Sequence, residues 1–189
     1  NYSQYGIPDE MLLKRLSNLE EPDLICVTSG MTYWYSGVFK VIEITKKFFK
    51  NVPVILGGIY ATLCYDHAER YSGADIVYKG GNEREAVKLI SKLTGFRLRH
   101  EPRWIHGCPE PNMVQGELPI PQSPLRTEEL PYPAFDLYPH LDYVCITTTR
   151  GCPFHCTYCA SPILSKGFVR RDPLKVVDEI SHWTTQFHI

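Results

Sequence analysis

The first half of the chain alternates short apolar runs with segments of helical periodicity, and this alternation restricts the fold more than any other feature. The apolar runs occupy residues 24–27, 53–56 and 75–78, and small residues such as glycine, serine and threonine follow each run. Runs that are apolar throughout, separated by amphipathic helices, are typical of parallel strands buried on both faces. Residues 1–95 are therefore predicted to form a parallel three-layer α/β domain.

Four helices are predicted around these strands from the spacing of apolar residues. They cover residues 8–19, 38–49, a short stretch ending near Tyr71 before the stop at Gly73, and 83–93 with Gly95 as its C-cap. Two of them have predicted inward faces, namely Met11, Leu12, Leu16 and Leu19 in the first and Ala86, Val87, Ile90 and Leu93 in the last.

The rest of the chain divides into a connector and a second domain. Residues 96–141 hold most of the chain's 15 prolines and no sustained periodicity, which is typical of a linker. Residues 142–189 are predicted to contain a strand at 143–149, a cysteine loop and a helix from Pro173, with Asp172 as its N-cap. The predicted buried face of that helix comprises Val176, Val177, Ile180, Trp183 and Phe187.

Three cysteines, Cys152, Cys156 and Cys159, form a C-x3-C-x2-C pattern in this loop. Three thiolates in one loop suit a [4Fe–4S] cluster, and because four irons need four ligands, one iron stays open for a substrate or cofactor. The alternative is a structural zinc site, in which the pair Cys156 and Cys159 is completed by His155, Cys145 or Cys108.

With Tyr158 as the aromatic residue before the last cysteine, the pattern resembles the radical S-adenosylmethionine signature. The flanking residues 147–153 and 160–162 resemble that family's lead-in and exit. The resemblance implies that 142–189 begin a partial TIM barrel with its first βα unit. It further implies that Cys152, Cys156 and Cys159 bind the cluster, that Tyr158 lines the adenine side through its backbone, and that S-adenosylmethionine is cleaved to a 5′-deoxyadenosyl radical.

The ends of the three predicted strands offer a second candidate site. Ligands of open parallel sheets bind outside the carboxyl ends of the strands, although glycines at these positions also simply form tight turns. Two ranges, 54–62 and 73–77, resemble the cobalamin-binding domain that precedes many radical S-adenosylmethionine domains and has a flavodoxin-like (Rossmann-like) fold. A third range, 130–136, resembles that family's junction between the two domains. This resemblance implies a cobalamin over the following residues: Ser29, Gly30, Gly57, Gly58, Tyr60 and Gly80.

The chain departs from that family in two places. The Asp-x-His-x-x-Gly motif that supplies a histidine to cobalt is absent, and the usual Gly-Glu-Gly-Glu is replaced by Gly80-Gly81-Asn82-Glu83. Either the domain's first strand precedes Asn1, or cobalamin is held without a histidine. Two further groups have open roles. The aromatic residues 33–35 pack in the core or on a corrin. Arg170-Arg171 are expected to be a solvated surface pair, with the binding of an anion or the capping of the first barrel helix as alternatives.

Composition excludes several partners and suggests a compartment. A formal net charge of −1 gives no basis for binding nucleic acid or an anionic membrane, and no apolar run approaches the ~20 residues that span a bilayer. Seven cysteines, an odd number with three in one loop, favour a reducing compartment, so the cytoplasm is expected.

The sequence as a whole predicts a radical S-adenosylmethionine enzyme with a 4Fe–4S cluster, S-adenosylmethionine and cobalamin, possessing methyltransferase or related activity. Its partners would be a small-molecule substrate and an electron donor for cluster reduction. Neither a catalytic side chain, a substrate nor an oligomeric state is indicated. With 30 residues after Cys159, this chain is expected to be an inactive fragment whose cysteine loop is metal-free or displaced in aerobic preparations. The alternative is a non-catalytic flavodoxin-like binding module with a structural zinc site.

Overall fold

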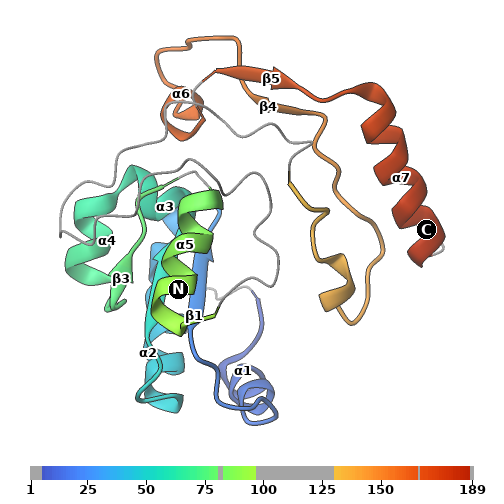
Figure 1. Ribbon diagram of the computed structural model, residues 1–189. Helices are drawn as coiled ribbons and strands as arrows, with labels where there is room; N and C mark the ends of the chain where they lie inside the picture. Colours follow the sequence, from blue (N-terminus) through green and yellow to red (C-terminus); the bar gives the residue numbers. More distant parts are fainter. Residues whose placement is uncertain (1–5, 81–82, 97–129, 166, 188–189) are drawn as a thin grey trace. The chain divides into compact units, whose positions relative to one another are not determined.

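The computed structural model describes residues 6–80, 83–96, 130–165 and 167–187, and these form two compact units (Figure 1). The first unit contains residues 6–80 and 83–96, and the second contains residues 130–165 and 167–187. Most of the predicted connector, together with Gly81 and Cys108, lies outside the described residues, so its boundaries stay predictions.

The first unit is built on a parallel sheet of three strands, β1 (Ile25–Ser29), β2 (Val54–Gly57) and β3 (Ile76–Val77). Their order is β1-β2-β3, so β2 is central, with Ile25 opposite Val54 and Ile55 opposite Ile76. The three strands coincide with the three apolar runs of the sequence, and the prediction of a parallel sheet is confirmed.

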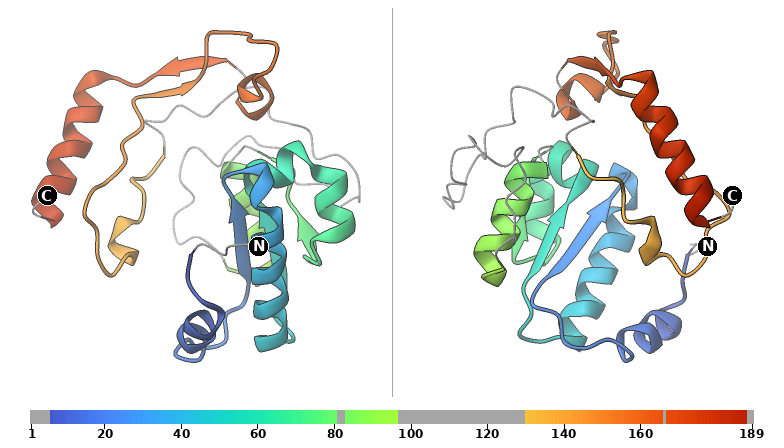
Figure 2. Two further views of the ribbon diagram at one scale, coloured as in Figure 1. Left: turned by 180° about the vertical axis from the view of Figure 1, so that it is seen from behind. Right: turned by 45° about the vertical axis from the view of Figure 1, so that its right-hand side comes forward.

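Helices cover both faces of this sheet (Figures 1 and 2). On one face, Val54 and Leu56 are fully buried against α2 (Tyr35–Phe48), α3 (Gly58–Leu63) and α4 (Tyr65–Tyr71). On the other face, Ile55 packs against Leu89 of α5 (Glu83–Thr94). Successive residues of a strand point to opposite faces, so a central strand between two helical layers must be apolar throughout. The three-layer α/β prediction is confirmed.

The helices of the first unit differ in detail from the predictions. Helix α1 is Asp9–Leu16, so Leu19 lies beyond its end and is exposed, as is Met11. In α5 the most buried apolar residue is Leu89 rather than Val87 or Ile90, with Ala86 and Leu93 packed beside it. The predicted short helix before Gly73 is two helices, α3 and α4, because Cys64 has non-helical backbone angles.

The second unit contains a short antiparallel hairpin rather than the predicted strand 143–149. Strand β4 (Thr149–Gly151) pairs with β5 (Phe168–Arg170), and Thr149 alone of the predicted run belongs to it. A strand needs a neighbouring strand for its hydrogen bonds. Within the described residues of this unit, only Thr149, at the end of the predicted strand 143–149, has such a neighbour. The predicted strand position is therefore wrong, and a first βα unit of a barrel stays a proposal.

Helix α7 (Pro173–Phe187) begins as predicted, because the Leu174 N–H donates to the Asp172 carboxylate at 2.9 Å. Trp183 is buried against Phe135 of the short helix η4 (Phe135–Leu137). Val177 and Ile180, predicted to be buried, are 57% and 44% exposed. Within the described part of this unit, only one face of α7 is buried. A further short helix, α6 (Ser161–Leu164), lies between β4 and β5.

Candidate functional site

The three cysteines lie in the loop that β4 and β5 enclose, between Gly151 and Phe168 (Figure 1). The two ends of the loop are held very close together. Gly151 has a φ of +79°, and a Cβ there would lie 1.9 Å from the Gly167 carbonyl oxygen, so only glycine fits this crossing. The hairpin thus delivers Cys152 directly from the strand end into a closed loop.

Within the loop, Cys156 and Cys159 belong to one turn, since the Cys159 N–H donates to the Cys156 carbonyl at 3.0 Å. Ser161 contacts the Cys159 sulfur twice, through Oγ at 3.2 Å and through N at 3.4 Å. These two hydrogen bonds lower the pKa of the Cys159 thiol, because they stabilise its thiolate. The thiolate is the form of cysteine that binds metals.

All three cysteines are free thiols, with Cys156 exposed and the other two half-buried. Across residues 6–80, 83–96, 130–165 and 167–187, no three side chains of His, Cys, Asp or Glu converge on one point as metal ligands. Of the residues that could complete the zinc alternative, His155 lies in this loop, Cys145 is exposed outside it, and Cys108 lies outside the described residues. The loop itself presents three sulfurs, which suit an iron–sulfur cluster, together with the imidazole of His155, which keeps the zinc alternative open.

Tyr158 lies in the same loop and is 91% exposed. Its ring is not part of any described core cluster. The predicted contact with an adenine through the Tyr158 backbone stays a prediction.

In the first unit, the predicted ligand residues gather at the carboxyl ends of the strands, but several are used by the fold itself. The Ser29 hydroxyl is buried and donates to the Met31 carbonyl at 2.7 Å. Gly58 lies against β1, where a Cβ would be 2.7 Å from the Ser29 carbonyl oxygen. A Cβ on Gly80 would be 2.6 Å from the Tyr78 ring. Packing alone therefore requires glycine at position 58, whereas a side chain at position 80 would displace the Tyr78 ring.

Tyr60 is part of the core rather than of the exposed strand-end surface. It is 1% exposed, and its hydroxyl is 2.7 Å from Nδ1 of His67. Burial, with smaller contributions from Cys64 and Tyr35, raises the pKa of Tyr60. At Gly30 and Gly57 the backbone at the strand ends is uncrowded, since a Cβ at either position would make only ordinary contacts, at 3.8 and 3.9 Å.

Sequence reasoning missed two residues that shape these sites. Thr62 joins the ends of β2 and β3, because its hydroxyl lies 2.9 Å from the Gly58 carbonyl and 3.3 Å from the Gly80 carbonyl. Arg171 was expected at the surface and is instead buried in an ion pair with Glu179. The available signal was Glu179, which lies on the same face of α7 as Trp183. A carboxylate buried there needs a charged or hydrogen-bonding partner, which Arg171 supplies.

The aromatic residues after β1 are exposed, which excludes the core interpretation for Tyr33 and Trp34. Tyr35 differs, because its ring stacks on that of Tyr60 at 6.1 Å.

Of the helices that the structure describes, none combines the length and the apolar character needed to cross a membrane.

No family model matches the chain, and no solved structure gives a significant match. The chain is similar to an uncharacterized methyltransferase of Pyrococcus horikoshii, 28% identical over 172 residues that cover 85% of this chain and 36% of the relative. It is also similar to the anaerobic magnesium-protoporphyrin IX monomethyl ester cyclases of Rubrivivax gelatinosus and Synechocystis sp. The first is 24% identical over 185 residues (92% of this chain, 33% of the relative), and the second 25% over 178 residues (88% and 35%).

The chain spans about a third of the length of the curated relatives it matches. These relatives are enzymes by name, one a methyltransferase and two cyclases. The similarity therefore supports membership in a family of enzymes, at the level of broad class only.

Proposed function

We propose that the chain is part of a radical S-adenosylmethionine enzyme whose iron–sulfur cluster is held by Cys152, Cys156 and Cys159. The observation that carries the proposal is a closed loop presenting three free thiols at C-x3-C-x2-C spacing. When bound, the cluster and S-adenosylmethionine supply a one-electron cleavage that yields a 5′-deoxyadenosyl radical.

The residues of this chain contribute binding and orientation. The crossing at Gly151 sets the direction in which Cys152 enters the loop, and a main-chain hydrogen bond closes the turn that carries Cys156 and Cys159. The Ser161 main-chain N–H donates to the Cys159 sulfur and would stabilise negative charge on it in the bound state. Tyr158 is proposed to offer backbone groups to the adenine of S-adenosylmethionine.

The first unit is proposed to bind cobalamin over the carboxyl ends of β1, β2 and β3. The supporting observations are the parallel three-layer fold and the open backbone at Gly30 and Gly57. A methyltransferase or cyclase reaction is favoured by the names of the relatives. The reaction, its small-molecule substrate and its electron donor are proposed for the whole protein, of which this chain is expected to be an inactive part.

The cluster is tested by anaerobic reconstitution with iron and sulfide, followed by metal analysis and visible absorption. Single alanine substitutions at Cys152, Cys156 and Cys159 are each expected to abolish the broad visible band. Cys145→Ala is the matched control, because this exposed cysteine lies outside the loop and serves only the zinc alternative. One zinc per chain with no visible band would refute the cluster and favour the binding module, whether or not Cys145→Ala retains the zinc.

Cobalamin binding is tested by a spectroscopic titration of the chain with hydroxocobalamin under reducing conditions. Gly57→Ala is expected to weaken binding at least tenfold, since the fold tolerates a methyl there but a ligand at the backbone does not. Gly37→Ala in α2, where a Cβ meets nothing within 4 Å, is the control. Equal affinities in both variants, or no binding to the wild type, would leave the first unit as a scaffold.

A further inference from the structure

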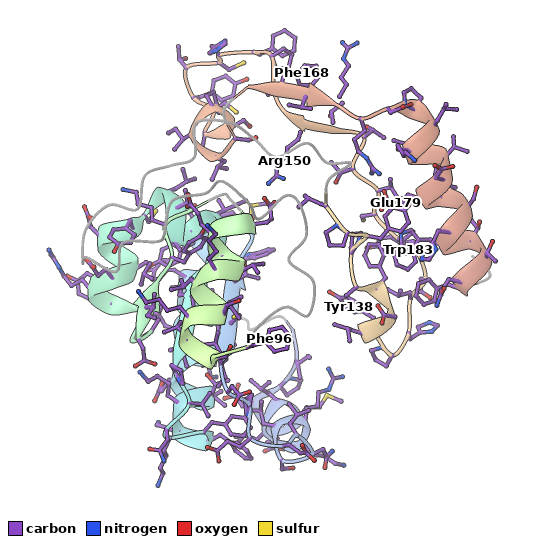
Figure 3. The ribbon with its side chains drawn as sticks, in the orientation of Figure 1. Phe96, Tyr138, Arg150, Phe168, Glu179 and Trp183 are labelled. Carbon is purple, nitrogen blue, oxygen red and sulfur yellow. The ribbon has the colours of Figure 1, made fainter. Side chains whose placement is uncertain are left out.

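A buried ion pair lies at the base of the cysteine hairpin. The side chains of Arg171 and Glu179 are 5% and 4% exposed, and Nη1 of Arg171 lies 2.5 Å from the Glu179 carboxylate. The same Nη1 donates to the Thr147 carbonyl at 2.8 Å. Glu179 in turn accepts a hydrogen bond from the Trp183 indole at 3.4 Å, and Figure 3 shows both side chains on the inner side of α7.

These contacts join the chain entering the hairpin to the chain leaving it. The Arg171 main-chain N–H donates to the Thr148 carbonyl at 3.0 Å, next to the pair of Thr149 with Arg170 that ends the β4–β5 ladder. The guanidinium reaches one residue further, to Thr147. Arg171 and Glu179 therefore fasten the open end of the hairpin to α7, opposite the crossing of Gly151 and Gly167.

The hairpin needs these additional contacts with α7, because each of its strands has only three residues. A two-stranded ladder this short is marginal by itself, and a slip of one residue would turn every side chain to the other face. The slip would also shift Cys152, which follows β4 directly. Stability alone is a weak reason for the ion pair, since apolar residues of similar volume commonly replace such pairs without loss.

We infer that Arg171 and Glu179 are positioning residues for the cysteine loop: they hold the register of β4 against β5 and so set where Cys152 stands relative to Cys156 and Cys159. The planar guanidinium suits this role because it can bond a carboxylate and a main-chain carbonyl in fixed directions. The role of these residues in cluster binding rests on the proposed function, whereas their role in holding the hairpin rests on the contacts described above.

The test compares Glu179→Gln with Asp178→Asn in the full chain. Asp178 neighbours Glu179 on α7 but is 59% exposed and pairs only with Lys175, so it is a matched control. In the metal-free protein, Glu179→Gln is expected to raise amide exchange of residues 149–151 and 168–170 at least tenfold. After reconstitution, it is expected to lose more than half of the bound iron and to alter the electron paramagnetic resonance spectrum. Asp178→Asn is expected to change none of these.

A charge swap separates positioning from simple stabilisation. Combining Arg171→Glu with Glu179→Arg restores opposite charges, but a carboxylate at position 171 has no hydrogen to donate to the Thr147 carbonyl. The swap is therefore expected to recover the melting temperature lost in Glu179→Gln, without recovering slow exchange or iron. Should either variant fail to fold, Arg171→Lys keeps the charge without the planar fork, and a rise of at least threefold in exchange is expected.

Three results would overturn the inference: wild-type exchange and iron in Glu179→Gln, full recovery of both in the swap, or wild-type exchange in Arg171→Lys. If the wild type binds no iron, the proposed function fails, and the exchange measurements still decide whether the ion pair holds the hairpin register.

Discussion

Gly58, at the start of α3, is the position where the structure predicts the largest effect of a single added methyl group in the first unit. Its φ is +88°, in the region that favours glycine. An alanine Cβ there would lie 2.5 Å from Thr28 Oγ1, 2.7 Å from the Ser29 carbonyl oxygen and 2.9 Å from the Ser29 nitrogen. Two of these neighbours are main-chain atoms of β1, which cannot move without disturbing the sheet.

The expected cost has two parts. A non-glycine residue in left-handed backbone costs about 1–2 kcal/mol, and forcing a methyl into packed backbone typically costs about 1–3 kcal/mol more. Gly58→Ala should therefore destabilise the first unit by about 2–5 kcal/mol. Gly73→Ala is the matched control, because Gly73 has a φ of +72° but a Cβ there meets nothing within 4 Å, which leaves only the first part.

Native-state hydrogen exchange is the suitable assay, because a chain of two units need not unfold in one transition. The free energy of opening is read from the amides of β1 and β2, including Val27 and Leu56. The difference between Gly58→Ala and Gly73→Ala isolates the clash with Ser29 and is expected to exceed about 1 kcal/mol. A difference below about 0.5 kcal/mol would refute the reasoning.

Three other predictions concern capping, pH and the hairpin. Asp172→Ala should cost about 1 kcal/mol and speed amide exchange at Leu174, because the N-cap acceptor is lost. Burial raises the pKa of the Glu85 carboxyl, so the folded state holds this proton more tightly than the unfolded state does. The stability that follows is present in acid and is lost as the pH rises through the raised pKa. Glu85→Gln should accordingly gain stability over the wild type at about pH 7 and lose that advantage near about pH 4 in urea melts, and a constant difference would contradict this. Gly151→Ala should open the β4–β5 ladder, seen as fast exchange of its amides, since its Cβ would overlap the Gly167 carbonyl, and an unchanged ladder would disprove the crossing.

The sheet of the first unit could be predicted from the sequence because its signal is local. Val54, Ile55 and Leu56 are apolar in succession, and a strand covered on both faces requires this. The stop at Gly73 and the N-cap at Asp172 could be predicted for the same reason, since each depends on a few neighbouring residues.

The cysteine spacing is also a local feature, and the proposed cluster chemistry follows from it alone. Only the tertiary structure decided how the loop is held. The hairpin pairs Thr149 with Arg170, and its ion pair joins Arg171 to Glu179 and Thr147. Thr147 is 24 residues from Arg171 and Glu179 is eight residues from it, and no local periodicity encodes these contacts. Burial of Arg171 likewise depended on the nearby carboxylate, because a charge leaves water only where a partner compensates it.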